Sequence, residues 1–164
     1  MKSKKEIDAT KDPLYHDTWI LLRKYRDVVW SLEVSVQKAK RIFQVEFGRS
    51  IEDFLESIYI AGVDFAESGI EEHAKCIEQS YQMLKLVDSS VNLLREKHKK
   101  GEEYYWILYY SFLSPQQYHN AEEIIELLQP HVLDISYRTY YRKRKEAIAI
   151  LSSILWGYTA KDYL

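Results

Sequence analysis

The stretch that decides the fold is AEEIIELLQPHVLDISYRTYYRKRKEAIAILSSILW, residues 121–156. Apolar residues recur at helical spacing on both sides of Pro130, which cannot continue a helix. Asn120 can cap the first helix, and either Asp134 or Ser136 can cap the second. We therefore expect a short helix, a turn formed by QPHVLD, and a long helix whose first turns are basic and aromatic.

Earlier residues are predicted to form long helices. Asp12 and Pro13 are typical of a helix start, and Gly48 is typical of its end. A second long helix is expected over residues 70–98, and a shorter one over 104–114. Apolar residues repeat every seven positions in both long helices, which is typical of coiled coils. The repeats are Tyr15, Leu22, Val29, Val36 and Phe43 in the first helix, and Ile70, Ile77, Leu84 and Val91 in the second.

These elements predict an all-α fold, with long antiparallel, coiled-coil-like helices followed by a C-terminal trihelical helix-turn-helix domain. We expect residues 1–12 to be a disordered tail and residues 13–99 to be an arm for oligomerisation or interaction. A helix that begins at Ser50 would belong to this arm. The polar stretch EKHKKGEE contains Gly101 and is the predicted boundary, so the helix-turn-helix domain would span residues 102–158.

Composition argues against several classes of protein. The single cysteine, Cys76, permits neither a disulfide within the chain nor a cysteine-based zinc site, which suits a reducing cytoplasm. No run approaches the ~18 apolar residues of a membrane span, and the basic N-terminus lacks the apolar segment of a signal peptide. The sequence has no glycine-rich phosphate loop and no HExxH motif. We therefore expect no catalytic residue, no metal, no cofactor, no membrane contact and no enzymatic activity.

Charge is distributed unevenly along the chain, although the net charge is only −2. Residues 50–133 contain six basic and fifteen acidic residues, whereas residues 134–164 contain six basic and three acidic ones. An acidic middle followed by a basic end favours a local site for a polyanion.

Within residues 121–156, the long helix that starts near Ser136 is predicted to present one face to a ligand and the other to the core. Helical spacing places two phenols and three cations on one side. The apolar side is expected to pack against Ile124 and Leu128 of the short helix. A helix held in this way fits the major groove of double-stranded DNA. The exposed set is Tyr137, Arg138, Tyr141, Arg142 and Lys145, and the core set is Tyr140, Ala147, Ile148, Leu151 and Leu155.

Each side chain near the start of this helix has an expected role on DNA. Arg138 can bind a guanine edge with two hydrogen bonds. Ser136 and Thr139 can donate to phosphate. Tyr137 and Tyr141 can bond phosphate or pack on a sugar or a thymine methyl group. The cations that follow are expected to hold phosphates: Arg142, Lys143, Arg144 and Lys145.

Residues 104–156 resemble the region-4-type helix-turn-helix of sigma-70 factors, and in particular phage late-gene regulators of the ArpU and RinA type. The run SYRTYYRKRKEAI at residues 136–148 carries most of this resemblance. The resemblance implies a phage or prophage transcription regulator in the cytoplasm of a bacterial host. The QPHVLD turn is longer than the three or four residues of a compact helix-turn-helix, so we expect an unusual tilt of the second helix. The positions implied to bind DNA are Ser136, Arg138, Thr139, Tyr141 and Arg142.

Two other interpretations remain open beside a sequence-specific, DNA-binding transcription regulator. One is a phage packaging or assembly subunit that binds DNA, similar to a small terminase, which would form rings. The other is a helical protein-interaction domain whose basic helix binds an acidic partner. In the regulator interpretation, residues 14–99 are expected to form a homodimer or higher oligomer, or to hold RNA polymerase.

Overall fold

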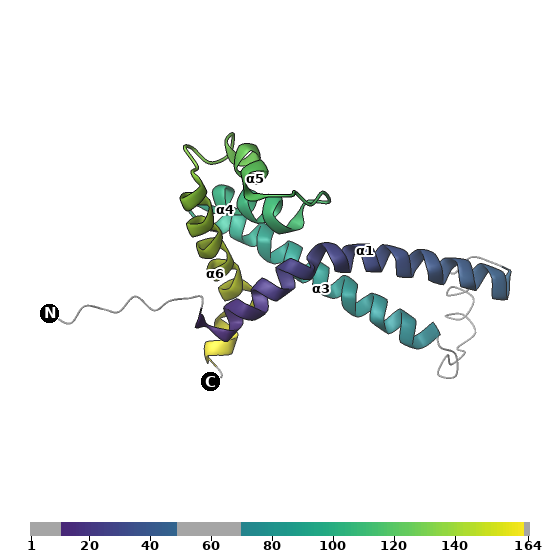
Figure 1. The fold of residues 1–164 in the computed structure, drawn as a ribbon. Helices are drawn as coiled ribbons and strands as arrows, with labels where there is room; N and C mark the ends of the chain where they lie inside the picture. Colours follow the sequence, from purple (N-terminus) through teal and green to yellow (C-terminus); the bar gives the residue numbers. More distant parts are fainter. Residues whose placement is uncertain (1–10, 49–69, 163–164) are drawn as a thin grey trace. The chain divides into compact units, whose positions relative to one another are not determined.

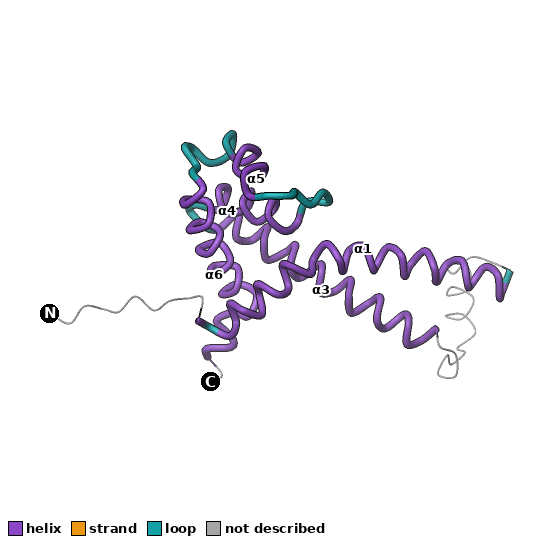
Figure 2. Tube along the Cα trace, in the orientation of Figure 1, coloured by secondary structure: helices purple, strands orange, loops and turns teal. Residues whose placement is uncertain are grey.

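The structure, a computed structural model, describes residues 11–48 and 70–162. Every regular element within these two ranges is helical (Figures 1 and 2). The predicted all-α class is therefore confirmed for the described part of the chain. The tail predicted over residues 1–12 lies mostly outside these ranges, and the helix predicted from Ser50 lies entirely outside them.

The described helices lie close to their predicted positions. The predicted helices over 13–47 and 70–98 correspond to α1 and α3, and the predicted short helix to α5. No described helix is long and apolar enough to cross a membrane. In chain order the elements are α1 (Pro13–Phe47), α3 (Ile70–Lys97), α4 (Gly101–Leu108), the π-helix η2 (Tyr109–Leu113), α5 (Ala121–Leu128) and α6 (Tyr137–Asp162).

Local chemistry at the helix ends explains most of these boundaries. The Asp12 carboxylate accepts from the Leu14 N–H at 2.9 Å, and α1 stops at Gly48, which has a φ of 67°. The Asn120 side chain accepts from the backbone N–H of Glu123 at 3.0 Å and caps α5. Gly157 has a φ of 70° and a ψ of 165°, so the regular helix is interrupted there, at the predicted end of α6.

The chain divides into two compact units. The first comprises residues 1–26 and 86–164, and the second comprises residues 27–85. Both α1 and α3 contribute to each unit, so these limits differ from the predicted division between an arm (13–99) and a DNA-binding domain (102–158).

The first unit has two buried apolar clusters, and α4 contributes to both. Its neighbouring residues Ile107 and Leu108 belong to different clusters. Tyr140 shares one cluster with Leu128, and Ile124 packs against it, as predicted for the two helices of residues 121–156. The larger cluster comprises Leu22, Val87, Val91, Leu94, Tyr104, Leu108, Phe112, Ala147, Ile148 and Leu151, with Leu155 packed against it.

The helix predicted over residues 104–114 changes geometry halfway. It is α-helical in α4 and π-helical in η2, where the Ser114 N–H donates to the Tyr109 carbonyl at 2.7 Å. Arg26 of α1 donates to the carbonyls of Ser114 at 2.8 Å and of Ser111 and Tyr110 at 3.3 Å. Carbonyls at a helix end lack partners in their own helix, so Arg26 supplies the donors that this end requires.

The seven-residue repeats are only partly buried. Leu22, Leu84 and Val91 are buried, whereas Val29 is half-buried. The side chains of Phe43 and Ile70 lie outside the described part, and those of Val36 and Ile77 are half-buried.

Candidate nucleic-acid interface

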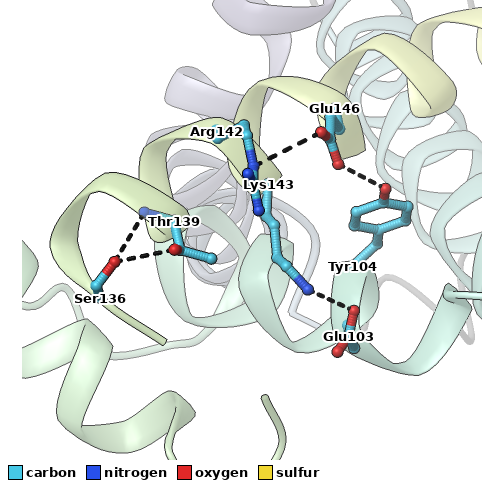
Figure 3. A network of polar contacts seen from close by, with 7 residues as sticks. All are labelled: Glu103, Tyr104, Ser136, Thr139, Arg142, Lys143 and Glu146. Carbon is cyan, nitrogen blue, oxygen red and sulfur yellow. Dashed lines mark hydrogen bonds and ion pairs between the residues drawn. The ribbon is translucent and has the colours of Figure 1, made fainter. Parts of the chain in front are cut away.

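Ser136 is the N-cap of α6. Its hydroxyl accepts from the Thr139 N–H at 3.2 Å and lies 2.9 Å from the Thr139 hydroxyl (Figure 3). Asp134, the alternative cap, instead has a φ of 52° in the preceding turn. Both hydroxyls predicted to donate to phosphate are thus hydrogen-bonded to each other. Ser136 and Thr139 thus lie beside the first backbone N–H groups of α6, at the start of the predicted recognition helix.

The predicted exposed face is largely present. Arg138, Arg142 and Lys145 are exposed, and Tyr137 is 57% exposed. Tyr141 differs from the expectation because it is half-buried and packs against the cluster that contains Tyr140. The result is a face with three accessible cations and one accessible phenol.

The two tyrosines of this face contact each other. The ring centroids of Tyr137 and Tyr141 are 4.9 Å apart in an edge-to-face arrangement, and their hydroxyls are 3.4 Å apart. The hydrogen bond with Tyr141 raises the pKa of Tyr137 above its ordinary value. Because Tyr141 is held by the core, it can fix the orientation of Tyr137.

Arg142 has a weak partner on its own helix. Its Nε lies 4.0 Å from the Glu146 carboxylate, and its side chain remains 67% exposed. Glu146 also accepts from the Tyr104 hydroxyl at 2.8 Å (Figure 3). Burial and this hydrogen bond raise the pKa of Tyr104 to about 12. Glu146 is therefore anchored to α4, and Arg142 stays available to an external anion.

Lys143 is not available in this way. Its ammonium lies 2.7 Å from the Glu103 carboxylate, and its side chain is only 15% exposed (Figure 3). The ion pair with Glu103 joins α6 to α4. The phosphate role of Lys143 stays a prediction.

Arg144 is also turned toward the protein. Its guanidinium carbon lies 4.7 Å from the ring centroid of Tyr141, 5.1 Å from that of Trp19 and 5.6 Å from that of Tyr140. Its Nε is buried and has no hydrogen-bond partner among the residues that the structure describes. Stacking on aromatic faces stabilises such a guanidinium. In the structure Arg144 packs on aromatic rings, and its phosphate role stays a prediction.

Helical spacing contains the signal that separates these cations. Arg144 lies four residues after Tyr140 and four before Ile148, and both of those residues are buried. Positions four apart share one face of a helix, so Arg144 belongs to the core side. The partners Glu103 and Trp19 could not be identified in this way, because they lie far away in the sequence.

The described residues contain no group of three or more His, Cys, Asp or Glu side chains that could hold a metal ion.

Sequence reasoning did not identify three residues that contact α6 on its protein-facing side. These are Trp19, Glu103 and Tyr104. Among the described residues, the candidate interface is the exposed side of α6, where Arg138, Arg142 and Lys145 are accessible.

Comparisons with protein-family models, with curated proteins and with solved structures find no match for this chain. The class of protein must therefore be argued from the described geometry. That geometry is a short helix, α5, which packs on α6, and an α6 whose outward side carries cations near its start.

Proposed function

We propose that this chain is a sequence-specific DNA-binding transcription regulator that reads the major groove with α6. The observation that carries the proposal is the separation of cations on α6. Arg138, Arg142 and Lys145 are exposed on one side, while Lys143 and Arg144 are engaged with the protein. A helix with one accessible cationic side and a firmly packed opposite side is suited to a DNA groove.

The proposal assigns η2, α5 and α6 to a trihelical helix-turn-helix unit. In this unit α5 is the supporting helix, and the turn that follows it contributes to the same core. Leu128 at the end of α5, Val132 in the turn and Ile135 just before α6 are all buried in one cluster with Tyr140. A turn held by its own buried residues can position a recognition helix although it is longer than usual.

Side-chain chemistry distributes the roles on DNA. Arg138 lies in the first turn of α6, where a recognition helix approaches base edges, and its planar guanidinium matches a guanine edge. Arg142 and Lys145 lie further along the same side and would neutralise phosphates. Tyr137 is suited to a phosphate oxygen or a thymine methyl group. Residues 136–148 resemble phage late-gene regulators, which extends the proposal to a phage or prophage origin, to contact with the host RNA polymerase and to a non-enzymatic role.

The first experiment compares two lysines on α6. A duplex is selected from a randomised library for binding to the wild-type chain, and its affinity is then measured against salt concentration. Lys145→Ala is expected to weaken binding and to lower the salt slope by about one, without loss of stability. Lys143→Ala is expected to lower the free energy of unfolding by about 1–2 kcal/mol, because Glu103 loses its partner, with DNA affinity nearly unchanged.

The second experiment removes the proposed base-reading residue, Arg138, together with the proposed phosphate-binding residue, Arg142. Arg138→Ala together with Arg142→Ala is expected to weaken binding about 100-fold, since a bidentate base contact and a phosphate contact are both lost. Arg138→Ala alone should also relax the base preference at one position of the selected duplex. Equal binding of the double variant and the wild type would show that α6 is not the reading element. Absence of any duplex binding at low salt would instead favour an acidic protein partner.

A further inference from the structure

In the second unit, α1 has an apolar side that the described structure leaves uncovered. Trp30 is 69% exposed, Val34 is 48% exposed and Val45 is 80% exposed. At about 100° per residue these three positions fall on one side of the helix. The repeat positions Val29 and Val36 are half-buried and lie on roughly the opposite side. Among the described side chains of residues 27–47, α1 therefore carries two apolar sides, and the side of Val29 and Val36 is the more buried one.

Charged residues flank Val34 on this exposed side in a defined order. Asp27 lies seven residues before Val34, and Arg41 lies seven residues after it. Lys38 lies four residues after Val34, as Trp30 lies four residues before it. All five residues fall within an arc of about 80°. Asp27, Lys38 and Arg41 are exposed in the structure. Between Asp27 and Arg41, this side thus begins acidic, is apolar in the middle and ends basic, and Val45 lies one turn beyond Arg41.

We infer that this side of α1 binds the same side of α1 in a second copy of the chain, antiparallel, about a two-fold axis at Val34. Residues equally far before and after the axis then face each other. Asp27 of each copy faces Arg41 of the other, two helical turns from the axis. Trp30 of each copy faces Lys38 of the other, in position for a cation–π contact. A symmetric dimer requires such a self-complementary surface.

The charge order discriminates against other arrangements. In a parallel pair of the same helices, Asp27 would face Asp27 and Arg41 would face Arg41, and like charges in contact oppose association. An isolated exposed tryptophan would be unremarkable. Here the tryptophan is followed at helical spacing by two further exposed apolar residues and is flanked by opposite charges.

This inference is independent of DNA binding by α6, since all the residues involved lie in the second unit. It assigns a specific contact surface on α1 to the self-association expected of residues 14–99. It also places the contact away from the half-buried repeat of Val29 and Val36.

The first test is sedimentation of the full chain in the absence of DNA. We expect a monomer–dimer equilibrium with the dimer populated at about 100 µM, because one helix side forms a small interface. Asp27→Arg alone and Arg41→Asp alone should each weaken dimerisation by roughly tenfold, since each change acts twice in a symmetric dimer. The combined variant should return to near wild-type association, because the opposite charges are exchanged and not lost.

A second test uses position-specific cross-linking in a Cys76→Ser background, which removes the only cysteine. Val34→Cys should cross-link between copies with a short bismaleimide, because the two side chains meet at the axis. Ser35→Cys is the matched control, since Ser35 is exposed but points about 100° away.

Three results overturn the inference: a chain that stays monomeric at about 100 µM, a charge exchange that fails to restore association, or cross-linking of Ser35→Cys as efficient as that of Val34→Cys. A monomer would mean that this side of α1 does not bind a second copy of the chain. Loss of DNA binding in the Arg138 and Arg142 variants has no bearing on these outcomes.

Discussion

Among single residues, Arg26 donates hydrogen bonds to several groups at the end of another helix. Its Nε donates to the Ser114 carbonyl at 2.8 Å, and one terminal nitrogen also lies 3.1 Å from the Ser114 hydroxyl. The other contacts reach the Ser111 and Tyr110 carbonyls. A guanidinium offers five donors in a fixed planar fork and can serve several separated carbonyls at once, whereas a lysine ammonium offers three donors on a single nitrogen.

Arg26→Ala is expected to lower the free energy of unfolding by about 2–3 kcal/mol, because partly buried carbonyls lose charge-assisted donors. Arg26→Lys should recover only part of this loss. The matched control is Arg23→Ala, since Arg23 is exposed and its guanidinium carbon lies 5.7 Å from the Trp19 ring centroid, and it should cost less than about 1 kcal/mol. Urea denaturation measures all three values, and equal losses for Arg23→Ala and Arg26→Ala would contradict the capping role.

Tyr104 predicts a dependence of stability on pH. Its pKa is about 12 in the folded chain and about 10 in an unfolded one. The unfolded state therefore loses its proton first, so the contribution of Tyr104 is fully present below pH ~10 and is lost as the pH rises toward ~12. Tyr104→Phe keeps the ring but has no such proton. Urea midpoints measured between pH ~9 and ~11.5 should fall less steeply for Tyr104→Phe than for the wild type, and identical slopes would exclude this linkage.

Local spacing predicts which way a residue of α6 points, but not what it meets. Tyr140, Ile148 and Leu151 were placed in the core from periodicity alone, and all three are buried. Lys143 was expected to be accessible because it belongs to a basic run. Its actual environment depends on Glu103, which is 40 residues away in the chain. Charge patterns record no such distant partner, so the candidate site could be predicted as a helix face but not residue by residue.

Among the elements, the junction between α3 and α4 requires a close approach of the backbone. A Cβ at Gly101 would contact the Arg95 carbonyl oxygen and would lie 2.6 Å from the Leu94 carbonyl oxygen. From sequence, Gly101 was predicted to lie in a polar domain boundary, the stretch EKHKKGEE. In the structure it is the buried first residue of α4, packed against the end of α3.

Gly101→Ala is expected to destabilise the first unit by about 3 kcal/mol or more, because a backbone carbonyl cannot move aside as a flexible side chain can. Gly48→Ala is the matched control. Gly48 has a φ of 67°, but no atom lies within 4 Å of an added Cβ, so only backbone strain of about 1 kcal/mol is expected. Thermal denaturation compares the two variants. A milder effect at Gly101 than at Gly48 would mean that the α3–α4 junction yields easily.

Helix ends were predictable because each depends on residues within one turn. Asp12, Asn120 and Ser136 all act as caps through their own side chains. The π-helical turn of η2 was not predictable, since the donors at its end come from Arg26, more than 80 residues earlier in the chain. Sequence thus indicates where a helix stops more reliably than which helical geometry it adopts.

Across the whole molecule, α3 belongs to two environments. Its C-terminal part contributes Val87, Val91 and Leu94 to the large buried cluster of the first unit. Its described side chains in the second unit include only one buried apolar residue, Leu84. Among its described residues, α3 therefore buries more apolar side chains in the first unit than in the second.

This difference predicts unequal hydrogen exchange within one helix. Amides of residues 87–97 should exchange only when the first unit opens, whereas amides of residues 77–85 should exchange through cheaper local opening. Mass spectrometry of peptides should show slower exchange in the C-terminal part at concentrations low enough to prevent association. Val91→Ala provides the control, because a cavity in the large cluster should accelerate exchange in residues 87–97 much more than in residues 77–85. Uniform protection along α3, with a uniform response to Val91→Ala, would mean that both units open together.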